Sequence, residues 1–97
     1  MKYSFEARME AHDNRRKIID NNVDGAIDAI EKAIDEAIKI GEFESVVFLG
    51  SFLNHFEDEI KTEINNNLSM YGYRVEWRDD YAIVNYEEGW KPSFIFL

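Results

Sequence analysis

The stretch LSMYGYRVEWRDDYAIVNY, residues 68–86, decides the fold, because its apolar spacing changes from helical to alternating across Gly72. Beyond Gly72, apolar and charged residues alternate, which is typical of a half-buried strand. If Asp79 and Asp80 form the turn, this segment predicts a hairpin with one apolar face. The facing pairs on that face are Trp77 with Ala82, Val75 with Val84 and Tyr73 with Tyr86. Arg74, Glu76 and Arg78 lie on the other face.

The segment before the hairpin predicts a strand followed by a helix. Residues 43–49 read FESVVFL, which suits either a short strand or the first turns of a helix, and Gly50 favours the strand. Ser51 is the expected N-cap of the next helix, which should end at Gly72. Its apolar stripe consists of Leu53, Phe56, Ile60, Ile64, Leu68 and Tyr71.

A long helix is predicted at the N-terminal end, with Ser4 as its N-cap and an end near Ile40, before Gly41. A helix of that length would measure roughly 54 Å at ~1.5 Å per residue. That is longer than a domain of this size is wide, so the helix either breaks within residues 21–25 or projects and packs against another subunit. The stripe keeps its phase there, which favours a long, possibly bent helix. The stripe is Phe5, Met9, His12, Arg16, Ile19, Val23, Ile27, Ile30, Ile34 and Ala37.

The expected fold is a single α+β domain over residues 1–97, with a small three-stranded sheet. Its parts are a long or bent helix in residues 1–40, a strand, helix and hairpin in residues 41–89, and an apolar tail in residues 90–97. A right-handed crossover would make the first strand parallel to residues 73–78 if the two are neighbours. The tail is too apolar to be solvated, so it should dock on its own sheet, on another subunit or on a target.

Composition limits the classes of partner. The chain has 97 residues, no cysteine and a net charge of −9, which excludes disulfides and thiolate zinc sites and disfavours nucleic acid or anionic membranes. No apolar run is long enough for a signal peptide or a membrane span, so we expect a cytoplasmic protein. The charge is uneven: residues 1–19 hold five basic and three acidic side chains (+2), which leaves six basic and seventeen acidic (−11) for residues 20–97.

A cationic strip on the first helix is the most unusual polar cluster. Arg8, His12, Arg15 and Arg16 stand at helical spacings where the apolar stripe should continue. Guanidinium groups bind phosphate, and an oligomer would gather several strips into a pocket for a nucleotide-like anion. Alternatively, this end is exposed and its cations pair with nearby carboxylates. Arg74 and Arg78 are secondary candidates for the same ligand.

An acidic ridge follows on the same helix, formed by Asp20, Asp24, Asp28, Glu31 and Asp35. Such a ridge could imitate nucleic-acid phosphates and occupy a basic groove on a nuclease or polymerase. The plainer interpretation is a solvated face that keeps a small protein in solution. Trp90, Phe94 and Phe96 of the tail are further candidates for contact with a partner protein.

Catalysis and metal binding have little support in the sequence. One cluster consists of residue types that can bind a metal ion, but consecutive helical residues point away from one another. Its members are His55, Glu57, Asp58, Glu59 and Glu63. Two histidines and no cysteine leave few groups for acid–base or nucleophilic work. We therefore expect no enzyme activity, no metal site and no cofactor.

The order of elements and several short motifs resemble a group of small accessory proteins of tailed bacteriophages. These motifs are Glu6-Ala7-Arg8, the segment AIKIGEF at residues 37–43, and Gly72-Tyr73-Arg74-Val75 at the opening of the hairpin. The chain departs from that pattern at Asn85-Tyr86, where such proteins often carry Ser-Trp, and in its added tail. The resemblance implies an accessory phage protein, a class that includes inhibitors of host defence.

Together these features suggest a non-enzymatic phage protein that forms a homo-oligomer and counters host defence. Its most concrete form is sequestration of a nucleotide-derived immune signal by Arg8, His12, Arg15 and Arg16. The first alternative is an acidic inhibitor of a host defence or nucleic-acid-handling protein. The second is a structural or assembly component of the phage.

Overall fold

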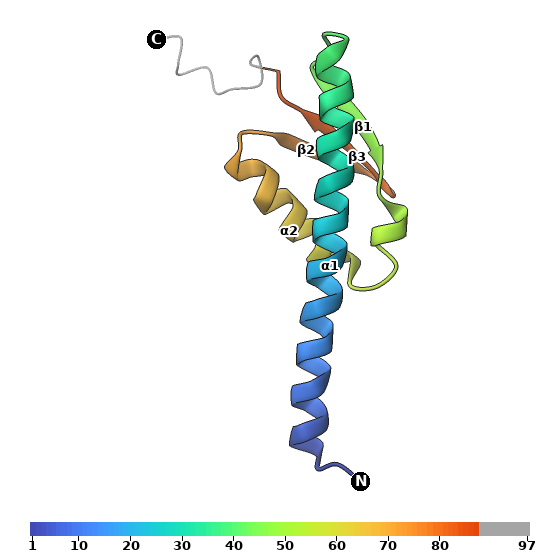
Figure 1. Ribbon diagram of the computed structural model, residues 1–97, viewed down its shortest axis with the longest axis vertical. Coiled ribbons are helices and arrows are strands. Elements are labelled where there is room, and N and C mark those ends of the chain that lie inside the picture. Colours follow the sequence, from blue (N-terminus) through green and yellow to red (C-terminus); the bar gives the residue numbers. More distant parts are fainter. Residues whose placement is uncertain (88–97) are drawn as a thin grey trace.

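The computed structural model describes residues 1–87, and its elements follow the order predicted above (Figure 1). The elements are α1 (Ser4–Lys39), β1 (Glu44–Phe48), the 3-10 helix η1 (Gly50–Phe52), α2 (Glu57–Met70), β2 (Arg74–Arg78) and β3 (Tyr81–Asn85). The three strands form one sheet. The predicted α+β fold, with a long N-terminal helix and a small sheet, is therefore confirmed.

Helix α1 runs unbroken through residues 21–25, so the alternative of a break is not realised. Gly25 leaves room for the Phe52 ring against the helix, because a Cβ atom at this position would lie 2.6 Å from the Cε1 atom of Phe52. With 36 residues, α1 spans most of the longest dimension of the molecule, which measures 63 × 31 × 20 Å.

The end of α1 is as predicted and its start differs slightly. Gly41 has φ of +77°, and the amide of Glu42 donates to the carbonyl of Ala37, which together form a Schellman motif. At the other end Tyr3 is the N-cap and Ser4 is already helical, with no side-chain cap bond. The prediction of Ser4 as N-cap is therefore wrong by one residue.

The two halves of α1 have different surroundings. In residues 19–39, the packed half, six side chains are buried: Ile19, Val23, Ala26, Ile30, Ile34 and Ala37. In residues 4–18, the projecting half, every residue is exposed, including Phe5 and Met9 of the same stripe. Figure 1 shows this half extending away from the sheet and α2. The helix therefore projects, as one of the two predicted possibilities required.

The hairpin has the predicted register. Trp77 faces Ala82 and Val75 faces Val84 in the antiparallel pairing of β2 with β3. Asp79 takes a left-handed conformation with φ of +54°, which lets the two-residue turn close. The Tyr73 and Tyr86 rings meet edge to face, 5.9 Å apart, beyond the ends of the strands.

Strand β1 lies beside β3 and not beside β2, because the sheet order is β1-β3-β2. It pairs antiparallel with β3, with Val46 opposite Ile83. The condition for the predicted crossover, that β1 and β2 are neighbours, is therefore not met. The two strands point the same way with β3 between them.

Helix α2 starts later than predicted, at Glu57 and not after Ser51. Residues 50–52 form η1 instead, and Phe56 adopts a left-handed conformation with φ of +58° immediately before α2. Leu53 is still buried, so its apolar character reflects packing of the loop and not a helical turn. The C-terminal end is as predicted: Gly72 has φ of +88°, and the amide of Tyr73 donates to the carbonyl of Leu68.

Both helices pack on one face of the sheet. The buried cluster joins side chains from α1, β1, α2 and β3, with Ile30, Ile60, Ile64 and Val84 fully covered. Trp77 fixes α2 to β2, because its indole N–H donates to Asn65 at 2.9 Å and the Lys61 Nζ atom lies 4.9 Å from its ring centroid. The opposite face of the sheet bears exposed apolar side chains, among them Val46, Phe48 and Tyr81.

Candidate functional site

Two arginines of the predicted cationic strip, Arg15 and Arg16, connect α1 to α2. Arg15 donates to the Glu59 carboxylate at 2.8 Å, and its guanidinium carbon lies 4.4 Å from the ring centroid of Phe56. Arg16 donates to Glu63 at 2.7 Å and, through Nε, to Asp20 at 2.9 Å. These two side chains are thus already neutralised by carboxylates of their own chain.

The same ion pairs shift two pKa values in the expected directions. Hydrogen bonds to Asp20 and then to Glu63 raise the pKa of Arg16, and the reciprocal bond from Arg16 lowers the pKa of Asp20. The other strip members behave differently. Arg8 and His12 are exposed and, within residues 1–87, make no hydrogen bond or ion pair.

Arg74 and Arg78 are not brought together with the strip. Both are exposed and alternate with the core-facing residues of β2. Arg74 borders a hollow with Asn65 and Ser69 of α2, and Arg78 donates to Glu76 at 3.1 Å. The secondary candidates for a phosphate ligand therefore lie on another side of the molecule.

The acidic ridge forms one wall of a groove between α1 and α2. The groove consists of two adjoining hollows of about 440 Å³ and about 380 Å³ that share Asn67. The α1 side contributes Arg16, Asp20, Val23, Asp24, Ile27, Glu31, Ile34 and Asp35. The other side consists of Glu63, Asn66, Asn67, Leu68, Met70, Tyr71 and Tyr73. Of the five predicted ridge residues, only Asp28 lies outside this lining.

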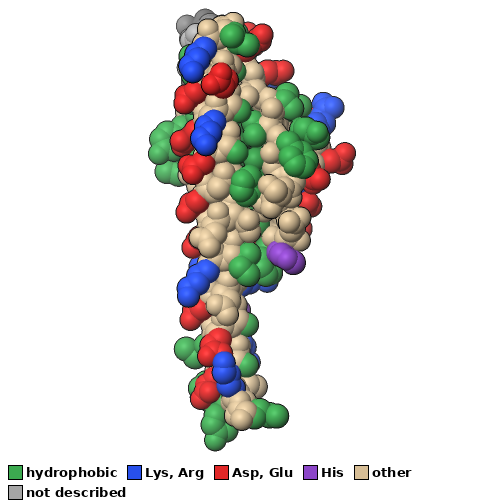
Figure 2. Space-filling model, turned by 45° about the vertical axis from the view of Figure 1, so that its right-hand side comes forward, with side chains coloured by type: hydrophobic (Ala, Val, Ile, Leu, Met, Phe, Trp, Pro, Cys, Tyr) green, Lys and Arg blue, Asp and Glu red, His purple; other side chains and the backbone are tan. Residues whose placement is uncertain are grey.

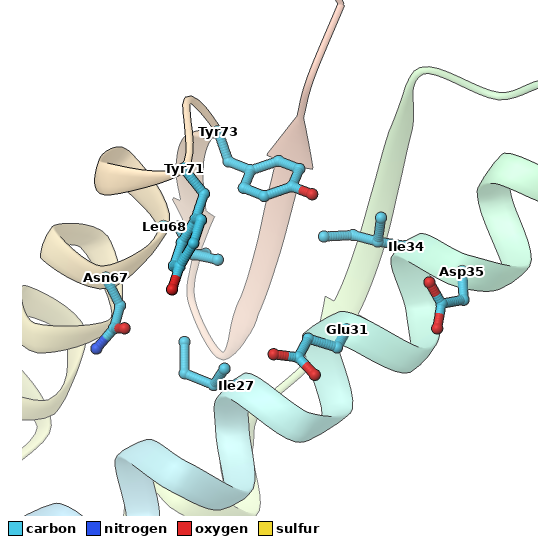
Figure 3. A pocket seen from close by; sticks show the side chains of 8 residues that line it. All are labelled: Ile27, Glu31, Ile34, Asp35, Asn67, Leu68, Tyr71 and Tyr73. Atoms are coloured by element: carbon cyan, nitrogen blue, oxygen red, sulfur yellow. The ribbon is translucent and has the colours of Figure 1, made fainter.

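The hollow of about 380 Å³, called the upper hollow below, combines carboxylates with aromatic rings (Figure 3). Glu31 and Asp35 stand on the α1 side, and the carboxylate of Glu31 points into the space between the helices. Tyr71 and Tyr73 stand across from them, at the end of α2 and the start of the hairpin. Such a combination suits a cationic group, which carboxylates attract and ring faces accept.

The floor of the groove is apolar and its acidic wall is largely uncompensated. Val23, Ile34 and Leu68 are buried beneath it. Asp24, Glu31 and Asp35 make no ion pair or hydrogen bond within the described part of the chain, whereas Asp20 is held by Arg16. The negative charge along the upper groove is therefore free to act on a ligand.

Tyr86 supports Tyr73, one of the two tyrosines that line the upper hollow. Its hydroxyl donates to the Glu42 carbonyl at 2.6 Å, and its ring contacts Tyr73. Burial, and after it the nearby Tyr73 and Glu42, raises the pKa of the Tyr86 hydroxyl. Tyr73 is thereby held in place at the end of the groove.

Sequence reasoning identified the acidic wall but missed the other one. Tyr71 was expected in an apolar helical stripe, Tyr73 on the apolar face of the hairpin and Asn67 on a solvated helix surface, and none of them was placed beside the acidic ridge. Their periodicity does not reveal that the end of α2 stands across from Glu31 and Asp35. Trp90, Phe94 and Phe96 of the predicted tail lie outside the described residues.

Three further observations bear on function. Across residues 1–87, no group of three or more histidine, aspartate and glutamate side chains is arranged to hold a metal ion. Neither helix in this part of the chain combines the length and apolar character needed to cross a membrane. No family model, curated protein or solved structure matches the chain.

Proposed function

We propose that this chain is a non-enzymatic binding protein whose α1/α2 groove receives a basic amphipathic helix of a partner protein. The observation that carries the proposal is the uncompensated acidic wall of Asp24, Glu31 and Asp35 beside a buried apolar floor. A helix with lysines or arginines on one flank and apolar anchors on its face matches both features.

Dimensions and charge support this class of partner. Between Arg16 and Asp35 the groove follows roughly 29 Å of α1 at ~1.5 Å per residue, the length of about five helical turns. At about 440 Å³ and about 380 Å³, the hollows have room for side chains from one face of a helix and not for its whole width. A net charge of −9 repels phosphate-rich ligands and attracts basic proteins.

The resemblance to phage accessory proteins supplies a class of target. In that context the partner would be a host defence or nucleic-acid-handling protein with an exposed basic helix. Binding would then compete with the nucleic acid that this helix normally contacts, and inhibition would follow from occupancy alone.

Peptide binding measured by fluorescence anisotropy tests the proposal. The probe is an amphipathic helical peptide with lysines and arginines on one face and leucines on the other. The control peptide has the same composition in scrambled order. The full chain should bind the amphipathic peptide at least about tenfold more tightly, because only that peptide presents anchors and charges together. Affinity should fall as salt is added.

A matched pair of variants locates the binding. Glu31→Gln with Asp35→Asn removes two charges from the groove and should weaken binding about tenfold. Asp13→Asn with Asp28→Asn removes two exposed charges that do not line the groove and should change affinity less than about threefold. Equal losses of affinity in the two variants, or equal binding of both peptides, would show that charge alone attracts the peptide. Either result would refute binding of the peptide in the α1/α2 groove.

Sequestration of an anionic nucleotide signal stays a prediction. Arg8 and His12 favour it, being exposed and without a partner in residues 1–87, whereas Arg15 and Arg16 already bind carboxylates. Calorimetry with cyclic oligonucleotides and NAD-derived signals distinguishes the two functions, since only sequestration requires heat of binding from those ligands.

A further inference from the structure

Strand β1 is an edge strand whose outer hydrogen-bonding groups face away from the sheet. Leu49 donates to Asp80 and Tyr86 donates to Phe43, so the odd-numbered residues along β1 make the bonds to β3. In an antiparallel ladder the intervening residues direct their N–H and C=O groups the other way. These residues are Glu44, Val46 and Phe48.

The same three residues also carry side chains on the open face of the sheet. Val46 is 60% exposed and Phe48 56%, and Tyr81, which lies opposite Phe48 in β3, adds exposed apolar surface beside them. Figure 2 shows the molecule from the side on which α1 and the β1 edge lie, with hydrophobic side chains gathered over the upper half of that side. Edge strands that remain single usually carry lysine, proline or a bulge, and within β1 the only charged residue is Glu44.

We infer that β1 pairs antiparallel with β1 of a second copy, across a two-fold axis at Val46, and so forms a continuous six-stranded sheet. The strand matches itself in this register. Val46 faces Val46 of the partner subunit, and Glu44 of each copy faces Phe48 of the partner subunit, so that no like charges meet. All three outward-facing residues then exchange backbone hydrogen bonds.

A second copy is the occupant that the strand itself specifies. The one charged residue of β1, Glu44, lies opposite Phe48 in this register and not opposite its own copy, so the strand meets a second copy across a two-fold axis without charge repulsion. The joined sheet also extends both apolar open faces into one surface. The α1/α2 groove lies on the other side of the sheet from this face, so the inference goes beyond the proposed function and stands or falls separately from it.

Cysteine cross-linking of the full chain tests the register, because the natural sequence contains no cysteine. A hydrogen-bonded antiparallel pair has Cα atoms about 5.5 Å apart, which a disulfide can bridge. Val46→Cys should therefore give a covalent dimer on mild oxidation. Glu44→Cys alone should not, since its two copies would lie four residues, or about 14 Å, apart along the strands at ~3.4 Å per residue. An equal mixture of Glu44→Cys and Phe48→Cys chains should cross-link again.

Native mass spectrometry of the unaltered chain provides the second measurement. We expect a dimer at tens of micromolar, its loss in Val46→Lys, and its retention in Met9→Lys, which alters a similarly exposed apolar residue on the projecting half of α1. A monomeric wild-type chain would overturn the inference. It would do so also if the Val46 and Phe48 amides of that monomer were protected from hydrogen exchange, because the protection would then come from the same chain. Cross-linking that is equally efficient at Glu44 and Val46 would also overturn it.

Discussion

The packed and projecting halves of α1 lie on one helical stripe, which His12 and Arg16 interrupt in the projecting half, and the two halves differ in what covers them. Ile30 lies in the packed half and is completely buried, whereas Met9 continues the same stripe and is 63% exposed. The sheet and α2 cover the first half, whereas in the second, within residues 1–87, α2 is reached by Arg15 and Arg16 and no side chain is buried. Periodicity therefore predicts that a helix has an apolar face, but the rest of the fold decides whether that face is buried.

The largest expected contrast comes from proline in each half. Ala29→Pro breaks the packed half, because proline removes a backbone hydrogen bond and clashes with the carbonyl four residues earlier. We expect a loss of about 3 kcal/mol or more in the free energy of unfolding. Ala11→Pro releases only turns that bury no side chain, so the loss should stay below about 1 kcal/mol. Urea unfolding followed by circular dichroism measures both, and equal losses would mean that the projecting half is also packed.

Truncation of the stripe should give a smaller contrast of the same sign. Ile30→Ala leaves a cavity in the core and should cost about 2–5 kcal/mol. Met9→Ala removes an exposed side chain and should change stability by less than about 0.5 kcal/mol. The midpoints of urea unfolding report both values. A large loss for Met9→Ala at dilutions where the chain is monomeric would contradict the comparison.

The smallest expected effect lies where the two halves meet, at the bond between Arg16 and Asp20. The folded pKa of Asp20 is lowered from its ordinary value of 3.8, so this carboxylate contributes stability above that pH and loses it as the pH falls through the folded value. Asp20→Asn should therefore be less stable than the natural chain at pH 7, with the difference shrinking toward pH 2. Because both side chains are about half exposed, the effect should be small and weaken with salt.

Asp13→Asn is the control for this titration. Asp13 is exposed and has no partner in residues 1–87, so Asp13→Asn removes one carboxylate without breaking an ion pair and should change the free energy of unfolding by less than about 0.5 kcal/mol. A difference between Asp20→Asn and the natural chain that is independent of pH would show that the bond with Arg16 is not its cause.

Much of the fold could be predicted because local patterns determine it. The register of the hairpin follows from alternation and a two-residue turn, and the ends of both helices follow from Gly41 and Gly72. The start of α2 could not be predicted in this way. Leu53 continues the helical spacing but is buried as part of a loop, so the spacing alone placed the helix too early.

The candidate site was predictable on one side only. The acidic wall lies on a single helix, so the spacing of Asp24, Glu31 and Asp35 was enough to place them together. The other wall depends on where α2 crosses α1. The bonds from Arg15 and Arg16 that fix this crossing join residues 44 and 47 positions apart, which no local pattern reveals.

The order of the strands in the sheet delays sheet formation while the chain is synthesised on the ribosome. Strand β3 occupies the centre of the sheet but is made after β1 and β2. Until β3 has emerged, β1 has no neighbour, and its run of valine and phenylalanine is open to other nascent chains. Production of this protein should therefore depend on how quickly residues 81–85 leave the exit tunnel, and a ribosomal pause placed just before them should increase aggregation.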